Sequence, residues 1–187
     1  DLHSFPTRRS SDLPTEEVES LTVVDYLRRA EVTVDTVSTT NKKSCIGAHC
    51  VEIVMDKLIK DMKLDYDGYI IPGGSDNAFS MKNNKELLDI LNKGFNDGKL
   101  IAAICAAPTV LYEAGITSGK KITSYPGVFK NGESGFEYLD EIVVKDNNLI
   151  TSRGPSTAVY WSLSIIEYLT SKEKREAIEK QILLNLI

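Results

Sequence analysis

The sequence predicts an α/β protein with a flavodoxin-like, doubly wound parallel sheet sandwiched by helices. Two observations predict this fold. Short apolar runs typical of buried strands alternate along the chain with segments of helical periodicity, which favours a parallel sheet covered on both faces. No internal repeat, low-complexity tract or linker divides residues 14–187, which we therefore expect to form a single domain.

The first helix is expected over residues 16–30, with Thr15 as its N-cap and acidic residues in its first turn, where the helix dipole favours them. Its apolar positions fall on two adjacent lines of the helix, Val18, Leu21, Val24 and Leu27 on one and Val23, Tyr26 and Ala30 on the other. Residues 32–38 alternate as a strand, residues 51–54 form a weaker one, and a short helical stretch leads to Met62.

The middle of the chain alternates buried strands with helices. Residues 68–72 and 100–105 are apolar runs that predict strands covered on both faces. The helix between them stops at Gly98, and the helix after the second strand has Pro108 in its first turn. The remaining predicted elements are helices at 84–96, 106–114, 156–169 and 172–186 and strands at 122–124, 142–144 and 149–151.

Composition and charge exclude several classes of function. The chain has a net charge of −5 and no long basic run, which argues against nucleic-acid binding. No apolar run reaches the roughly 18 residues of a membrane helix. Three cysteines and two histidines with no CxxC pair give neither a disulfide framework nor a zinc site, so we predict no metal and no cofactor. The sparse cysteines, with no signal peptide in residues 1–13, favour the cytoplasm.

The segment LIAAICAAPTVLYEAG, residues 100–115, carries the strongest chemical signal. A buried strand ends at Cys105 and a helix starts almost at once, so the side chain is held at the carboxyl edge of the sheet, where ligand sites of α/β proteins lie. Backbone N–H groups of the new helix would point at the sulfur and favour its anion. The local pattern leaves open that Cys105 is an inert core residue, as a lone cysteine in an apolar run usually is.

Two further features lie near the ends of other predicted elements. Gly73 and Gly74 follow Pro72 at the end of a buried strand, where they would let the backbone approach a ligand and expose N–H groups, or simply end the strand. Glu17 and Glu19 each share a helical line with apolar residues, so either carboxyl group could point inward. A solvated acidic first turn is the alternative for both.

These pieces together resemble one family. EExE at 16–19, PGG at 72–74, AAICAAP at 102–108 and TSRGP at 151–155 stand in the order and spacing of the DJ-1 branch of the DJ-1/ThiJ/PfpI superfamily, over roughly residues 14–170. The resemblance implies that Cys105 is a nucleophile and that Glu19, with a raised pKa, is the acid hydrogen-bonded to its sulfur. It further implies a set of residues for oxyanion and substrate binding at or near the site: Gly73, Gly74, Ala106, Arg29 and Tyr125.

The sequence departs from the family pattern at several positions. Tyr125 stands where many relatives carry a histidine near the cysteine, which excludes a Cys–His dyad. Ala106 follows the cysteine where the protease and chaperone branches have a histidine, which argues against a peptidase. Pro14 stands where the family has a glycine that follows the first strand of the sheet.

Residues 1–13 do not look like that first strand. They are polar, rich in Ser and Arg, and similar to the translated read-through of a sequencing adapter. A central strand must pair on both edges and be apolar on both faces, yet this segment offers only Leu2, Phe5 and Leu13 as large apolar groups. We therefore expect residues 1–13 to be a non-native or disordered leader and the first strand to be missing or replaced.

The resemblance implies two alternative functions that use the same residues. The first is a cofactor-independent glyoxalase III or deglycase, in which Cys105 adds to methylglyoxal-type aldehydes or their glycated adducts and Glu19 moves protons. The second is a redox-sensing or chaperone-like protein that uses Cys105 as an oxidisable thiol. In either case the resemblance implies a homodimer.

Overall fold

The structure is a computed structural model that describes residues 15–130 and 132–186. The expectations for residues 1–13, a leader and a missing first strand, lie outside the described residues, as does Pro14. Among the described residues no helix is long and apolar enough to cross a bilayer.

The main sheet confirms the predicted fold class. Its strands are, in spatial order, β5 (Gly68–Ile71), β6 (Leu100–Ile104), β10 (Leu149–Ser152) and β9 (Val143–Asp146). The first three are parallel, and β9 pairs with β10 in the antiparallel direction. The parallel strands are the buried apolar runs that the sequence singles out, because a strand covered on both faces needs apolar residues at every position.

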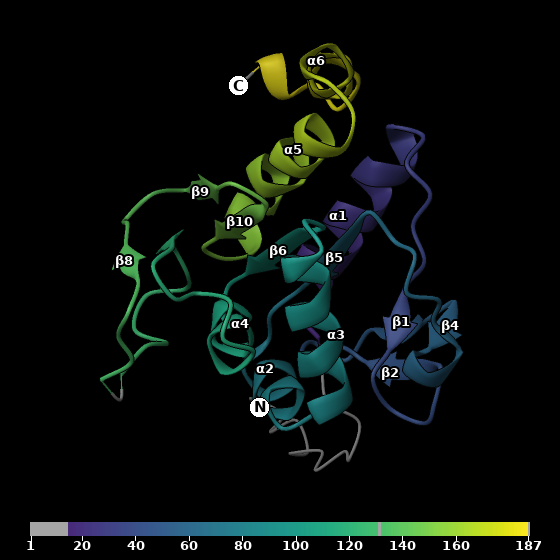
Figure 1. The fold of residues 1–187 in the computed structure, drawn as a ribbon. Coiled ribbons are helices and arrows are strands. Elements are labelled where there is room, and N and C mark those ends of the chain that lie inside the picture. The colour runs from purple at the N-terminus through teal and green to yellow at the C-terminus, as the bar shows by residue number, and fades with distance from the viewer. Residues whose placement is uncertain (1–14, 131, 187) are drawn as a thin grey trace, which may run out of the picture.

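Helices cover both faces of this sheet (Figure 1). One face carries α1 (Glu17–Arg29) and α5 (Ala158–Leu169), and the other carries α2 (Ser75–Lys82), α3 (Lys85–Asn96) and α4 (Pro108–Glu113). Successive residues of β6 serve opposite faces, since Ala102 packs in the same cluster as Leu27 of α1, whereas Ile101 packs in the same cluster as Leu91 of α3. Every residue of β6 is buried, which fixes the strand that leads to Cys105.

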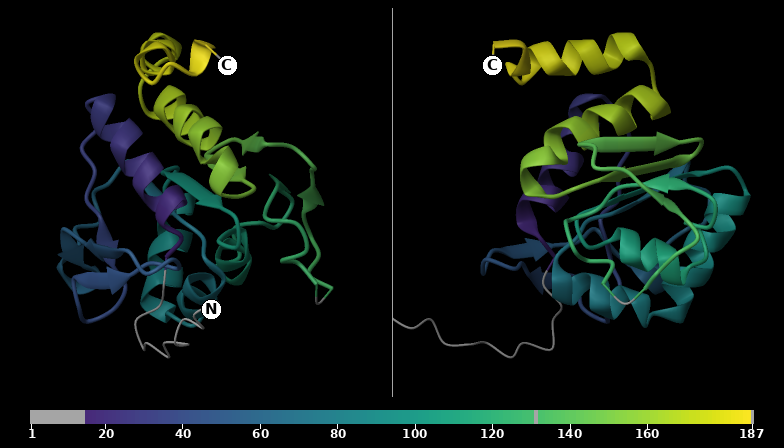
Figure 2. Two further views of the ribbon diagram at one scale, coloured as in Figure 1. Left: turned by 180° about the vertical axis from the view of Figure 1, so that it is seen from behind. Right: turned by 90° about the vertical axis from the view of Figure 1, so that its left-hand side faces the viewer.

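The C-terminal part adds smaller elements around this core. They are β7 (Lys121–Ile122), β8 (Glu137–Tyr138), η2 (Pro155–Thr157), α6 (Lys172–Gln181) and η3 (Leu184–Leu186). Helix α6 packs against α5 at the end of the molecule that Figure 2 shows uppermost. It ends earlier than the predicted residues 172–186, because Leu183 adopts a positive φ of 62° that no α-helix accommodates.

Residues 32–62 are organised differently from the main sheet. Of the strand expected over 32–38, β1 (Val37–Ser38) is the part that pairs with another described strand, β4 (Lys57–Leu58), and η1 (Ile59–Asp61) follows. A separate hairpin joins β2 (Ser44–Ile46), which the sequence does not predict, to β3 (Glu52–Val54). Cys45 is buried in this hairpin.

Helix α1 corrects one expectation. Its N-cap is Glu16, whose carboxylate accepts a hydrogen bond from the backbone N–H of Glu19, and not Thr15. Val23 and Ala30 of one apolar line and Leu27 at the end of the other are buried, while Val18 is half exposed. Because Glu19 lies on the line of Val23, the packing of α1 carries this carboxyl group into the protein.

Candidate active site

Cys105 occupies a tight turn between β6 and α4. Its backbone has a φ of 63°, in the left-handed region that non-glycine residues rarely adopt. Two hydrogen bonds hold the turn, from the N–H of Cys105 to the carbonyl of Ser152 at 3.1 Å and from the N–H of Tyr125 to the carbonyl of Cys105 at 2.9 Å. The thiol is therefore presented at the carboxyl edge of the sheet by a strained but well-anchored backbone, as functional sites often are.

The Glu19 carboxyl group reaches the same place from α1 and is completely buried. Its Oε2 accepts a hydrogen bond from the N–H of Gly73 at 2.8 Å, while Oε1 has no hydrogen-bond partner of ordinary geometry among the described residues. A Cβ atom at Gly73 would lie 2.6 Å from the Cβ of Cys105 and 2.7 Å from Oε2 of Glu19. Glycine is thus required at position 73, because the thiol and the carboxyl group converge on its backbone.

The thiol and the carboxyl group shift each other's pKa. Burial raises the pKa of Glu19 to about 7, although hydrogen bonds from Cys105 and Gly73 favour its charged form. Burial, the negative charge of Glu19 and a hydrogen bond to it raise the pKa of Cys105 to about 12. The pair therefore loses its first proton near pH 7, and above that pH it holds one proton and one negative charge between the sulfur and the carboxyl oxygen.

Backbone donors at the sulfur act against this rise. The N–H groups of Gly74, at the start of α2, and of Ala106 both lower the pKa of Cys105. They favour the anion, as expected, but they do not outweigh burial and the Glu19 charge, so the pKa of this thiol stays above that of a free cysteine. What they provide is a fixed pair of donors beside the atom where negative charge develops.

The structure separates the two candidate carboxylates, which the sequence pattern leaves open. Glu17 points away from Cys105 toward residues 47–49, where the backbone N–H of His49 donates to its Oε1 at 2.6 Å and His49 Nδ1 lies 2.9 Å from its Oε2. Burial alone would raise the pKa of Glu17, but these bonds lower it. They also raise the pKa of His49. Glu17 fastens a loop, while Glu19 contacts the thiol.

Among the described residues, Glu16, Glu17 and His49 form a group of possible metal donors whose donor atoms lie within 4.8 Å of each other. Hydrogen bonds already engage this cluster, because Glu16 caps α1 and both oxygens of Glu17 bind His49. The sequence analysis does not predict this link between His49 and Glu17. The tight approach of Gly47, where a Cβ would lie 2.3 Å from Oε1 of Glu17, leaves no mark in the sequence that could have revealed it.

Two further residues, Tyr125 and Arg29, were expected near the site, and the structure places only the first beside Cys105. The backbone of Tyr125 bonds to Cys105, and its half-exposed ring lies against Gly154. Arg29 lies at the far end of α1, ten residues from Glu19 or about 15 Å along the helix axis, and pairs with Asp25. Within this chain Arg29 therefore lies away from Cys105, and its expected part in substrate binding stays a prediction.

Comparison with known proteins agrees with this geometry. The chain matches the model of the DJ-1/PfpI family over residues 13–168. It is 39% identical to the Drosophila melanogaster protein dj-1beta, covering 90% of this chain and 91% of that protein, and the crystal structure of DJ-1beta superposes with a TM-score of 0.87 over 91% of this chain and 93% of that one. It is also 36% identical to the Caenorhabditis elegans glutathione-independent glyoxalase DJR-1.2, covering 92% and 94% of the two chains. The chain therefore belongs to the DJ-1/PfpI family.

Proposed function

We propose that the protein is a cofactor-independent glyoxalase III or deglycase that converts methylglyoxal-type aldehydes, or their early adducts, through Cys105. The observation that carries the proposal is the buried pair of Cys105 and Glu19, which shares one proton near neutral pH at the carboxyl edge of the sheet. A related protein of similar length is named a glutathione-independent glyoxalase. A nucleophile paired with a proton carrier is what addition to an aldehyde requires.

The first step uses the shared proton. The sulfur of Cys105 forms a bond to the aldehyde carbon, and the proton held by the pair passes to the aldehyde oxygen, giving a hemithioacetal. The N–H groups of Gly74 and Ala106 stabilise negative charge beside the sulfur as the thiolate forms and as the carbon–sulfur bond later breaks.

The second step is an isomerisation. Glu19, as carboxylate, removes the proton from the former aldehyde carbon to give an enediol and returns a proton to the neighbouring carbon. The product is a thioester of Cys105, which water hydrolyses to lactate and the free thiol. In sum, methylglyoxal and water give lactate, with no net oxidation and no cofactor.

The test is steady-state formation of lactate from methylglyoxal by the purified protein, without glutathione and with a metal chelator present. In deuterium oxide the enediol route predicts lactate that carries deuterium at the second carbon, because the proton on Glu19 exchanges with solvent. Absence of lactate would overturn the proposal. Lactate without deuterium would instead point to direct hydride transfer between the two carbons and remove Glu19 from that step.

A second candidate function is redox sensing by a homodimer. It is favoured by the backbone donors of Gly74 and Ala106, which would also stabilise a sulfinate on Cys105. In that case low peroxide should oxidise Cys105 before the exposed Cys50, and methylglyoxal should yield no lactate. Mass spectrometry of the three cysteines, performed beside the lactate assay, distinguishes the two functions.

A further inference from the structure

Two peptide units of the loop between β5 and α2 direct their N–H groups at the reacting pair. The N–H of Gly73 donates to Oε2 of Glu19 at 2.8 Å, and the N–H of Gly74 is one of the donors at the sulfur of Cys105. In a trans peptide unit the carbonyl points opposite to the N–H, so the carbonyls of the same two units, those of Pro72 and Gly73, point away from the pair. A group that binds these two carbonyls therefore fixes the direction of both donors.

A single side-chain amide binds both carbonyls. Nδ2 of Asn77, in the first turn of α2, donates to the carbonyl of Gly73 at 3.1 Å and, over a longer distance of 3.4 Å, to that of Pro72. Because both acceptors are carbonyl oxygens, the NH₂ group of the amide and not its oxygen must face them. The Gly73 carbonyl also accepts a hydrogen bond from the N–H of Glu16 at 3.3 Å, so Asn77 provides the shorter of these two bonds.

The peptide unit between Gly73 and Gly74 needs such an anchor, because its backbone can adopt more than one orientation. Gly74 has a φ of 93° and a ψ of 124°, a region that glycine alone enters readily. Rotation of this peptide unit by half a turn would bring φ of Gly74 to a negative value, in the extended region, and would swing its N–H away from the sulfur. Local backbone preference therefore does not select the orientation that serves Cys105, whereas hydrogen bonds to the Gly73 carbonyl do.

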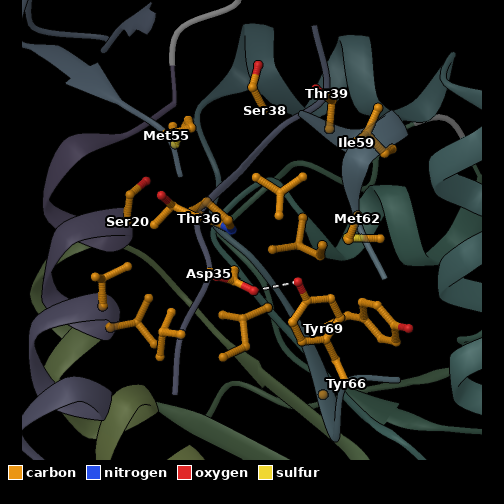
Figure 3. Close-up of a pocket in the computed structure, with 18 of the residues that line it drawn as sticks. Ser20, Asp35, Thr36, Ser38, Thr39, Met55, Ile59, Met62, Tyr66 and Tyr69 are labelled. Carbon is orange, nitrogen blue, oxygen red and sulfur yellow. Dashed lines mark hydrogen bonds between the residues drawn. The ribbon is translucent and has the colours of Figure 1, made fainter. Parts of the chain in front are cut away.

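Asn77 reaches this loop from the wall of a cavity of about 590 Å³, which lies between residues 32–38 and strand β5 (Figure 3). Within the part of the chain that the structure describes, its amide binds backbone carbonyls and neither the thiol of Cys105 nor the carboxyl group of Glu19. Asn77 therefore acts on the pair through the peptide units that it holds.

We infer that Asn77 is a positioning residue, which holds the Gly73–Gly74 peptide unit with its N–H directed at the sulfur of Cys105. The inference deepens the proposed function, and its catalytic part rests on that function, because a donor at the sulfur aids catalysis where negative charge develops. The bond from the amide to the carbonyl also polarises the peptide unit, which makes its N–H a stronger donor. The longer second bond supports the donor to the carboxyl group in the same way.

The first test measures the reactivity of the thiol and does not require turnover. In the wild type the rate at which iodoacetamide alkylates Cys105, followed by mass spectrometry, should rise with a midpoint near pH 7, where the pair loses its first proton. Asn77→Ala loosens two donors that favour the charged forms of the pair, so this midpoint should move up by at least about half a pH unit. The exposed Cys50 in the same samples is the internal reference, and its rate should not change.

Asn83→Ala is the matched control, because Asn83 makes the same kind of bond at the other end of α2. Its Nδ2 donates to the carbonyl of Phe79 at 2.7 Å, beyond the last turn of the helix. A merely structural effect on α2 would appear in both variants, whereas a loss of positioning appears in Asn77→Ala alone. An unchanged midpoint in Asn77→Ala, or an equal shift in both variants, would overturn the inference.

The second test measures the orientation of the peptide unit by NMR. A bond to a sulfur that carries negative charge moves the amide proton of Gly74 downfield, and this chemical shift should change as the pair titrates near pH 7. In Asn77→Ala both the downfield position and its pH dependence should shrink, while Asn83→Ala should keep both. A Gly74 amide proton that behaves alike in the wild type and in Asn77→Ala would contradict the inference.

The lactate assay separates this inference from the proposed function. Where lactate forms, Asn77→Ala should lower kcat by about tenfold with little change in KM, because the lost donor acts on charge that develops during the reaction. A tenfold rise in KM at unchanged kcat would overturn the catalytic part of the inference. If no lactate forms while both other effects are seen, the proposed activity is wrong, but Asn77 still holds the donor at Cys105.

Discussion

The two halves of the molecule on either side of α1 differ in how their backbone is paired. In the closed half, β5, β6, β10 and β9 form one continuous sheet with helices on both faces. In the open half, residues 32–62 form two separate two-stranded sheets, and the cavity lies between them and β5. The difference teaches that the proposed chemistry depends on the closed half, because the groups that contact Cys105 are held there or by α1.

Helix α1 belongs to both halves and places one carboxylate toward each. Glu19 turns into the closed half and shares a proton with Cys105, whereas Glu17 turns toward the loop of the open half and fastens His49. Two residues along a helix, or about 200° of rotation, are enough to give two carboxylates opposite roles. Paired substitutions, one in each half, can therefore test this division.

The largest expected effect is on the rate of lactate formation when single cysteines are replaced. Cys105→Ser should reduce lactate formation by at least about a thousandfold, because a hydroxyl is a far weaker nucleophile than the paired thiol. Cys50→Ser, an exposed residue of the open half, should leave the rate unchanged. Comparable losses in both variants would show that the closed half does not hold the chemistry.

The second effect is on stability. Ile150 is completely buried in β10, and its replacement by alanine should lower the free energy of unfolding by about 2–5 kcal/mol. Val34 lines the cavity, so its methyl groups lack partners on one side, and Val34→Ala should cost less than about 1 kcal/mol. Urea unfolding followed by the fluorescence of the buried Trp161 measures both. Equal losses would mean that the open half is packed as tightly as the closed one.

The same division explains how much of the fold the sequence could predict. The strands at 68–71 and 100–104 were predicted almost to the residue, because a strand buried on both faces is apolar at every position. Residues 32–36 alternate as a strand should, but pairing depends on a neighbour that periodicity does not report. The short hairpin β2–β3 escaped prediction for the same reason, since its few residues carry too little pattern.

The site could be predicted in part. The strand that ends at Cys105 and the two glycines at 73–74 were visible as local patterns, and the resemblance chose Glu19 over Glu17. What local sequence could not supply was the direction of each side chain from α1. Nor could it weigh burial against backbone donors at the sulfur, which only the three-dimensional environment of Cys105 decides.

The third prediction concerns stability against pH. The pKa of Glu19 rises from 4.5 to about 7 on folding, so the unfolded chain loses this proton first. The stability that protonated Glu19 contributes is fully present below pH 4.5 and is lost as pH rises through 7, by about 3 kcal/mol in total. Glu19→Gln cannot ionise, so it should match the wild type at pH 4.5 and exceed its stability by up to this amount at pH 8.

Glu17→Gln is the matched control for that titration, because the pKa of Glu17 is lowered rather than raised. The charged Glu17 carboxylate stabilises the fold above its unfolded pKa, and this stabilisation is lost as pH falls. Glu17→Gln should therefore be less stable than the wild type at pH 8, whereas Glu19→Gln should be more stable. Urea unfolding at a series of pH values measures the free energy of unfolding of both variants. If Glu19→Gln were destabilised at pH 8, the carboxyl group would be better solvated than its burial indicates.

The smallest effect, and the one that bears most directly on the division between the halves, is on the pH profile of catalysis. The reactive state of the pair holds one proton, and it forms as the first proton is lost near pH 7. The kcat/KM for methylglyoxal should therefore rise with pH with a midpoint near 7. Glu19→Gln should lower kcat/KM by about a hundredfold and abolish this midpoint, because an amide cannot carry the proton. Glu17→Gln should keep both the rate, within a few-fold, and the midpoint. A midpoint that moved in Glu17→Gln instead would mean that the loop held by His49, and with it the open half, takes part in the proton transfer.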